Sequence, residues 1–221
     1  ESIRERKSNC KIHIPGSGEE YGEVDISQLP INLETPLNPV NPYAVTKIAQ
    51  DLIAYVYFRS YGVNAIRTRA FNHEGPRREN VFGIASYASQ IARIEKGLQP
   101  PIIETGDLND KRNFTDVRDM VKAYKIAMEK CLPGELYLVG SNEADHIFTF
   151  REVLEKLISL SLTKGITHKQ IPEYTRPTQV PYLIADIDKF HKLTGWKPSI
   201  SVDQMLAEIL EYWRRRVKTE S

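Results

Sequence analysis

The sequence predicts an α/β fold in which helices cover a parallel sheet. The first observation is that short apolar runs alternate with a longer segment of helical period, in the order strand, loop, helix, strand. The second is size, because 221 residues with 41% hydrophobic composition suffice for one globular domain or two small ones. A helix that connects two strands in this way normally leaves them parallel in one sheet.

The first unit of the chain carries clear boundary signals. A short apolar run ends in a turn, and a polar loop with several prolines follows it. Pro42 then occupies the first turn of a helix, where its missing N–H costs nothing, and Gly62 ends that helix. The expected elements are a strand at 10–17, a loop at 23–41, a helix at 43–61 and a strand at 63–71.

Apolar residues recur at helical spacing within 43–61, so we expect one face of this helix to cover the sheet. The stripe consists of Ile48, Leu52, Ile53, Val56 and Tyr57. Further along, two capping boxes open two more helices. The later expected elements are helices at 86–97, 116–130, 149–160 and 201–218, with strands at 101–106 and 135–140. Trp196 is expected in the core, sealing the last helix.

Composition argues against several classes of function. The net charge of +1 gives no indication of nucleic-acid or membrane binding, and no apolar run approaches the length of a membrane span. Cys10 and Cys131 lie far apart, and we interpret them as free thiols in a reducing, cytoplasmic compartment. No metal site is expected, because the remaining histidines lack ligand spacing and are read as structural: His13, His146, His168 and His191.

The stretch NPVNPYAVTK, residues 38–47, contains the first candidate for chemistry. Tyr43 and Lys47 stand four residues apart and therefore share one helix face. A phenol beside an ammonium is suited to proton transfer, with Tyr43 as the acid or base and Lys47 as the group that tunes it. The alternative is a helical tyrosine that packs on a lysine stem, since this spacing is common.

Other polar segments follow strands, where ligands bind in parallel α/β sheets. In GSGEEYG, residues 16–22, Ser17 would contact a substrate hydroxyl and Glu19 would act as acid or base, unless this is only a polar turn. Three later loops offer hydrogen-bonding groups and arginine forks for a phosphate or diphosphate, or are solvated basic turns. The side chains concerned are Asn72, His73, Arg77, Arg78, Arg112 and Arg176.

The order of these segments is more specific than any one of them. The motifs S-x-E-x-Y-G, N-P-Y-x-x-x-K, F-N-H-x-G-P-R-R, K-R-N-F-T-D-V-R-D, R-P-T-x-V and G-W-K-P follow one another along the chain. This series resembles the extended short-chain dehydrogenase/reductases that modify nucleotide sugars. Within them it is most similar to the GDP-mannose 4,6-dehydratases and the related GDP-4-keto-6-deoxymannose reductases, from about residue 10 to the C-terminus.

The resemblance implies a role for each position. Ser17 matches the residue that contacts the sugar 4-hydroxyl, and Glu19 matches the carboxylate that removes the C5 proton. Tyr43 matches the base at O4, and Lys47 the lysine bonded to the nicotinamide ribose. The implied cofactor is NADP or NAD and the implied partner a nucleotide-diphosphate sugar. Cofactor contacts would come from Tyr43, Lys47, His73 and Arg78, and substrate contacts from Asn72, Val81, Arg112 and Arg176.

The resemblance leaves the reaction open. FNHEGPRR is more similar to the dehydratases, whereas FTDVRDMV and the EYWRRR ending are more similar to reductases and epimerases, and Gly18 departs from the polar residue of the relatives. The expected function is a GDP-mannose 4,6-dehydratase type of reaction. The alternatives are a 4-keto-sugar reductase, a 4-epimerase, a non-catalytic relative of the fold, or an unrelated α/β domain with chance matches.

The resemblance also implies a division of the chain. We expect residues 1–75 to be the C-terminal part of a Rossmann-type cofactor domain and 76–221 to be mainly a smaller α/β substrate region, with 115–145 returning to the first. The glycine-rich, N-terminal half of the cofactor domain is not found, so we expect a fragment that binds a dinucleotide weakly by itself. The family suggests a homodimer that pairs through the helix over 43–61.

Overall fold

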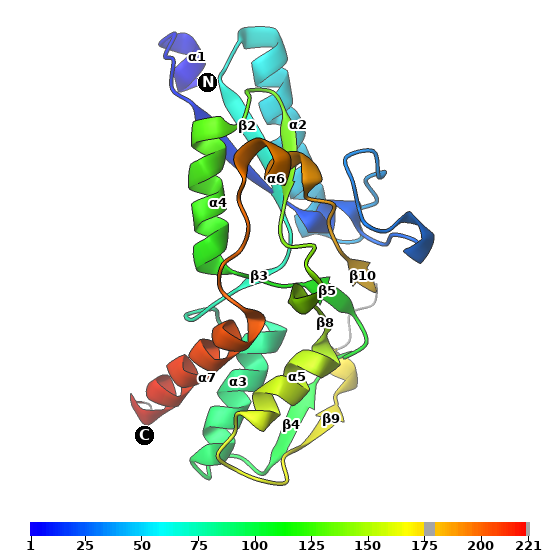
Figure 1. Cartoon of the computed structure of the whole chain (residues 1–221), viewed down its shortest axis with the longest axis vertical. Helices are drawn as coiled ribbons and strands as arrows, with labels where there is room; N and C mark the ends of the chain where they lie inside the picture. Colours follow the sequence, from blue (N-terminus) through cyan, green and yellow to red (C-terminus); the bar gives the residue numbers. More distant parts are fainter. Residues whose placement is uncertain (175–179, 220–221) are drawn as a thin grey trace.

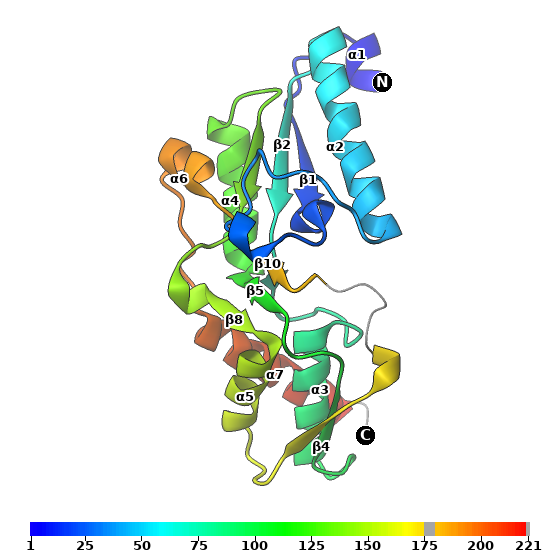
Figure 2. The same cartoon turned by 90° about the vertical axis from the view of Figure 1, so that its right-hand side faces the viewer.

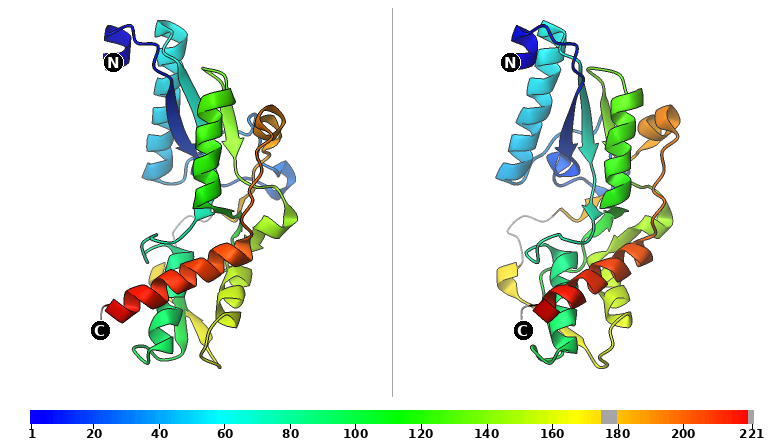
Figure 3. Two further views of the ribbon diagram at one scale, coloured as in Figure 1. Left: turned by 60° about the vertical axis from the view of Figure 1, so that its left-hand side comes forward. Right: turned by 90° about the vertical axis from the view of Figure 1, so that its left-hand side faces the viewer.

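The computed structural model describes residues 1–174 and 180–219. The chain forms an elongated molecule with different layers at its two ends (Figure 1). The end that carries the N-terminus holds a parallel sheet flanked by helices. The other end holds the C-terminus and a group of packed helices beside a pair of strands (Figure 3).

The sheet has all its strands parallel, as expected. It consists of β1 (Ile12–Ser17), β2 (Ala65–Ala70) and β7 (Leu136–Val139), in that order. Ser17 pairs with Ala70, so β1 and β2 end at the same edge of the sheet. The long helices α2 (Pro42–Tyr61) and α4 (Val117–Lys130) cover opposite faces (Figure 2). The predicted α/β class is therefore confirmed.

The boundaries of α2 follow from local sequence signals. Asn41 is the N-cap, and its Oδ1 accepts a hydrogen bond from the backbone N–H of Ala44 at 2.8 Å. Pro42 opens the helix and Gly62 closes it with a φ of 67°, in the left-handed region that glycine adopts without strain. The helix expected at 43–61 is thus confirmed with one more residue at its start.

The face that α2 turns to the sheet differs from the expected one. The buried residues of α2 are Ala44, Asp51 and Ala54. Leu52, Ile53 and Val56 of the expected stripe are instead 51%, 59% and 50% exposed. The prediction failed because the sheet beneath α2 presents arginine side chains from β2, which take up a buried carboxylate rather than an apolar stripe.

Three helices enclose the core of the other end. They are α3 (Gly83–Glu95), α5 (Phe150–Ser159) and α7 (Val202–Thr219). Ile91, Leu157 and Leu206, one from each helix, are fully buried in this core. The parallel pair β4 (Ile102–Thr105) and β9 (Thr167–Gln170) lies beside them. The capping box expected before α5 is confirmed, since Thr149 and Glu152 bond each other's backbone N–H.

The remaining elements are short, and most of them were not expected. The strands are β3 (His73–Glu74), β5 (Lys111–Asn113), β6 (Thr115–Asp116), β8 (Ile147–Thr149) and β10 (Tyr182–Leu183). The helices are α1 (Ser2–Glu5), η1 (Gly18–Tyr21), η2 (Ile26–Gln28), η3 (Ala144–His146), η4 (Pro172–Tyr174) and α6 (Asp188–Thr194).

Trp196 is in the core, but not where it was expected. It is 5% exposed and packs edge-on against Phe190 of α6, with ring centroids 5.7 Å apart. Both rings belong to the core between the sheet and α4, so Trp196 seals that layer rather than α7. Cys10 and Cys131 are free thiols, as expected.

Candidate functional site

The turn after β1 is built around Ser17 and Glu20. Ser17 caps η1, its Oγ accepting from the Glu19 N–H at 3.2 Å. The Glu20 carboxylate turns back to accept from the Ser17 N–H at 2.7 Å, which completes a capping box. Glu20 is fully buried in this structural role. The side chain of Glu19 is therefore the carboxylate that remains at the open side of the turn.

The first turns of α2 place Tyr43 and Lys47 beside the end of β1. Lys47 Nζ donates to Pro15 O at 2.8 Å and to Gln50 Oε1 at 3.2 Å. The same nitrogen lies 5.9 Å from the ring centroid of Tyr43. Tyr43 is 53% exposed. The helix thus presents an accessible phenol with an ammonium next to it.

Two contacts bring the predicted catalytic segments together. Asn41 Nδ2, just before Tyr43 in the chain, donates to Glu19 Oε2 at 3.3 Å. Lys47 reaches Pro15, just before Ser17, through the bond described above. The turn that carries Ser17 and Glu19 therefore contacts the start of α2, which carries Tyr43 and Lys47. The four expected catalytic positions belong to one local arrangement.

A second polar group follows β2. His73 Nδ1 is 2.9 Å from Phe71 O, and burial lowers the pKa of this histidine. Glu74 is 7% exposed, and burial raises its pKa from an ordinary 4.5 to about 7, although the nearby Arg78 opposes that shift. Arg78 Nε lies 3.3 Å from Glu74 Oε2, and its guanidinium stands 3.9 Å from the ring centroid of Phe82. His73 and Arg78 are thus held by their neighbours next to the sheet edge.

The positions expected to contact substrate have different environments. The Oδ1 of Asn72 is buried and has no hydrogen-bond partner among the described residues. Arg112 is 6% exposed and its Nη2 donates to Asp110 Oδ2 at 3.0 Å. Val81 is 81% exposed. Arg176 lies outside the described residues, so the structure neither adds it to nor removes it from this group.

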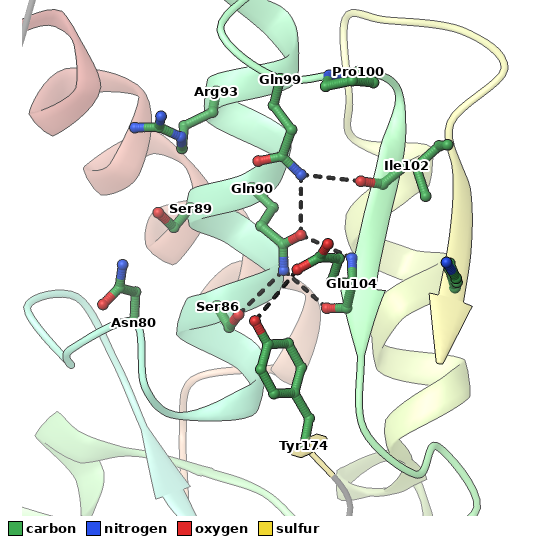
Figure 4. A pocket seen from close by; sticks show the side chains of 11 residues that line it. Asn80, Ser86, Ser89, Gln90, Arg93, Gln99, Pro100, Ile102, Glu104 and Tyr174 are labelled. Carbon is green, nitrogen blue, oxygen red and sulfur yellow. Dashed lines mark hydrogen bonds between the residues drawn. The ribbon is translucent and has the colours of Figure 1, made fainter. Parts of the chain in front are cut away.

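A cavity of 590 Å³ opens between α3, β4 and η4 (Figure 4). None of the residues expected from the sequence lines it, although Asn80 at its rim is next to Val81. Gln90 bridges α3 and β4 inside it, donating to Glu104 O at 2.9 Å and accepting from the Glu104 N–H at 2.8 Å. Because its central amide is occupied in this way, we assign no reactive group to this cavity.

Sequence reasoning missed two residues that shape the site. Asn41 was given no role within the stretch NPVNPYAVTK, yet it both caps α2 and bonds Glu19. An asparagine before a proline at a helix start is itself an N-cap signal and would have identified it. Glu20 was not given a role different from that of Glu19. Ser17, three residues before Glu20, was the signal for a capping box that could have identified that role.

The donor set fits the ribose of a nicotinamide cofactor. An ammonium has three N–H donors, and Lys47 uses two of them among the described residues. One donor therefore remains for a ribose hydroxyl beside the exposed phenol of Tyr43. No cluster of three or more metal-ligating side chains occurs within 1–174 and 180–219. No helix in the same described ranges is both long and apolar enough to span a bilayer.

Comparison with known proteins gives one family. A sequence model described as GDP-mannose 4,6 dehydratase matches residues 1–209. The chain is 36% identical to the GDP-6-deoxy-D-mannose reductase of Pseudomonas aeruginosa, over 92% of this chain and 66% of that protein. It is 27% identical to the GDP-mannose 4,6 dehydratase of Drosophila melanogaster, over 93% of this chain and 55% of that protein. The chain thus spans about half to two thirds of the length of these relatives.

Solved structures agree with the fold. RMD from Pseudomonas aeruginosa, complexed with NADPH, superposes with a TM-score of 0.89 at 32% identity, covering 97% of this chain and 70% of that one. The dTDP-glucose 4,6-dehydratase of Bacillus anthracis in complex with NAD gives a TM-score of 0.83 at 24% identity, covering 98% of this chain and 65% of that one. The latter likeness is one of fold alone. The predicted resemblance and the Rossmann-type part of the fold are confirmed.

Proposed function

Because the chain belongs to the GDP-mannose 4,6 dehydratase family, we propose that it carries the catalytic part of an NAD(P)-dependent enzyme that modifies a GDP-linked sugar. The observation that carries this proposal is the direct contact between the Glu19 turn and the start of α2, which places a carboxylate, a phenol and an ammonium in one arrangement. Such a set suits proton transfer at two neighbouring carbons.

The proposed reaction is a 4,6-dehydration. Tyr43, assisted by Lys47, accepts the proton of the sugar 4-hydroxyl, while Ser17 hydrogen-bonds the same oxygen. A ketone at C4 acidifies the C5 proton, so the Glu19 carboxylate removes it and delivers it to the C6 hydroxyl, which leaves as water. Tyr43, Lys47, His73 and Arg78 would hold NADP or NAD, which would supply the acceptor for hydride from C4 and the donor of hydride to C6. The proton taken from the 4-hydroxyl replaces the one lost at C5, so only water is lost.

Further side chains are assigned to binding. His73 and Arg78 would contact the cofactor, in addition to Tyr43 and Lys47. Asn72, Val81, Arg112 and Arg176 would line the nucleotide-sugar pocket. The support is that Asn72 carries a buried oxygen with no hydrogen-bond partner within 1–174 and 180–219, and that Arg112 is a buried guanidinium close to the same junction of the two ends. A diphosphate is a suitable ligand for such arginine forks.

A second candidate is reduction of a GDP-linked 4-keto sugar. It is favoured by the higher identity to the Pseudomonas aeruginosa reductase, 36% against 27% for the Drosophila melanogaster dehydratase. In this case Tyr43 donates its proton to the C4 oxygen as C4 receives a hydride, and Glu19 has no elimination to perform. The two candidates therefore differ in whether Glu19 is needed.

One experiment tests both candidates on the protein as its gene encodes it. GDP-mannose with catalytic NADP or NAD should yield a 4-keto-6-deoxy product if the chain is a dehydratase. A GDP-4-keto-6-deoxy sugar should oxidise stoichiometric NADPH or NADH if it is a reductase. The Glu19→Gln variant should abolish the first reaction and spare the second. If neither sugar reacts, the proposed function is wrong.

The division of the chain into a cofactor domain and a substrate region, and the oligomeric state, are also parts of this proposal. We assign 1–75 and 115–145 to the cofactor domain and most of 76–221 to the substrate region. The packing of α6 on β7 adds 188–194 to the sheet end. We also propose a homodimer through the outer, apolar face of α2, where Leu52, Ile53 and Val56 are exposed. Sedimentation of the natural protein and of an Ile53→Glu variant would test this, the variant being expected as a monomer.

A further inference from the structure

A buried ionic network lies between α2 and the sheet. Arg69 of β2 directs its guanidinium to acceptors on two other elements. Its Nε lies 2.7 Å from Glu20 Oε2, its Nη2 lies 2.6 Å from Asp51 Oδ2, and its Nη1 donates to Tyr21 OH at 2.8 Å. Glu20 and Tyr21 are fully buried, Asp51 is 2% exposed and Arg69 is 5% exposed. One side chain therefore joins β2, η1 and α2.

The charges of this network are balanced within it. Arg67, also on β2, pairs with the second oxygen of Asp51, with Nη1 2.9 Å from Oδ1. Its Nη2 donates to Gly134 O at 2.9 Å. Two guanidinium groups thus face two carboxylates. Removing such groups from water is costly, and apolar packing would usually hold a helix on a sheet at least as well. This indicates a role for the network beyond attaching α2.

The network holds both segments that carry the proposed catalytic residues. Glu20 Oε1 accepts from the Ser17 N–H, so the position of Glu20 fixes the turn that bears Ser17 and Glu19. A Cβ at Gly16 would lie 2.5 Å from the same Glu20 oxygen, so the absence of a side chain at position 16 makes room for this carboxylate. Asp51 is one helical turn beyond Lys47, and therefore fixes the part of α2 that bears Lys47 and Tyr43.

We propose that Arg69 is a positioning residue, which sets the Ser17–Glu19 turn against the Tyr43–Lys47 face of α2 through Glu20 and Asp51. This inference rests on the proposed function. The Asn41–Glu19 and Lys47–Pro15 bonds also connect the two segments, but they involve partly exposed side chains. The buried network is the rigid connection, and a catalytic group needs such support from the residues behind it.

The shape of the guanidinium group explains why an arginine occupies position 69. A guanidinium is a planar fork with several fixed donors and can serve three acceptors in different directions. A lysine has one nitrogen on a flexible stem, so it keeps the positive charge but cannot reach Glu20, Asp51 and Tyr21 together. Arg69→Lys therefore separates the bridging role from simple charge neutralisation.

The test compares this variant with the natural enzyme. We expect Arg69→Lys to lower kcat roughly tenfold to a hundredfold, because a misplacement of about 1 Å has an effect of that size. KM for the sugar should stay within about twofold, because Asn72, Val81, Arg112 and Arg176, which are assigned to sugar-nucleotide binding, lie outside the network. Amide hydrogen exchange should become faster in Ser17–Tyr21 and remain unchanged in α3.

Two further variants complete the design. Glu95→Gln breaks a comparable ion pair, Arg214–Glu95 at 2.8 Å, between α3 and α7, and should lower stability without changing kcat. Tyr21→Phe removes only the hydroxyl bonded to Arg69 and keeps the ring in the core. It should lower kcat about threefold to tenfold, in keeping with the loss of one hydrogen bond. It also serves as the test if Arg69→Lys does not fold.

The outcomes separate this inference from the proposed function. If the natural enzyme turns over a sugar and the network variants keep its kcat and its exchange pattern, the positioning role is overturned. If no sugar reacts, the proposed function is wrong. In that case hydrogen exchange still tests the positioning role of Arg69: faster exchange confined to Ser17–Tyr21 in the variants supports it, and unchanged exchange overturns it. An equal loss of kcat in Glu95→Gln would show a general effect of stability and would also overturn it.

Discussion

Glu74 makes the stability of the fold depend on pH in an unusual direction. Burial raises the pKa of its carboxyl from an ordinary 4.5 to about 7, and the partly exposed Arg78 opposes this shift without cancelling it. The folded chain therefore holds this proton where the unfolded chain has released it. Because the folded state binds more protons between about pH 4.5 and about pH 7, the free energy of unfolding falls as the pH rises through that window.

The size of the effect follows from the two values. At about 1.4 kcal/mol for each pH unit, the full contribution is about 3 kcal/mol, of which about 2.5 kcal/mol falls between about pH 5 and about pH 8. The variant Glu74→Gln cannot titrate, so it should lose this dependence. It should be more stable than the natural chain at the higher pH by up to that amount, less what the loss of the Arg78 ion pair removes.

Urea unfolding at the two pH values measures the difference. The free energy of unfolding is measured at both pH values, and its change is compared between the natural chain and Glu74→Gln. The contributions of other titrating groups are the same in both proteins and cancel in this comparison. Glu79→Gln is the matched control, because Glu79 lies nearby with a side chain that is 63% exposed. If Glu74→Gln shows the same pH dependence as the natural chain, the carboxyl of Glu74 does not titrate as argued here.

Substitutions at three other positions have expected outcomes. Asn41→Ala removes the cap of α2 and should lower the free energy of unfolding by about 1 kcal/mol in urea titrations, whereas Asn41→Ser keeps a cap oxygen without setting a second carboxylate against Glu19 and should not. Gly134→Ala places a Cβ 2.1 Å from the Phe58 ring at a φ of 78°, so unfolding should require at least about 2 kcal/mol less; a smaller loss would show that the ring moves aside easily. Tyr43→Phe should lower kcat by about a hundredfold or more while leaving the circular dichroism spectrum unchanged, and a rate near that of the natural enzyme would remove Tyr43 from the proposed chemistry.

Local signals explain which elements the sequence predicted. The ends of α2 were predictable because Asn41, Pro42 and Gly62 act through the backbone next to them. The strand β9 was not, since its four residues are all exposed and show no apolar alternation. Ile31 lies within the segment read as a loop, yet it is fully buried and bridges to Ala185. Such a contact depends on a partner far along the chain and leaves no local pattern.

In the candidate site, too, residues with local sequence signals were predicted, and residues that depend on distant contacts were not. Ser17, Glu19, Tyr43 and Lys47 were found through motifs, and their two segments indeed meet in the structure. The residues behind them were not found, because a carboxylate such as Asp51 on a helix normally marks a solvated face. Only the neighbouring arginines of β2, which are far away in sequence order, make its burial possible.

The four charges under α2 also limit how this sequence can evolve. A single substitution that removes one charge from Glu20, Asp51, Arg67 or Arg69 leaves the buried charges unbalanced, which costs about 3–5 kcal/mol of a stability that is typically about 5–15 kcal/mol. Neutral drift at these positions therefore requires coordinated exchanges, in which two or more of them change in concert. An engineer who wishes to move α2 would have to redesign all four at once.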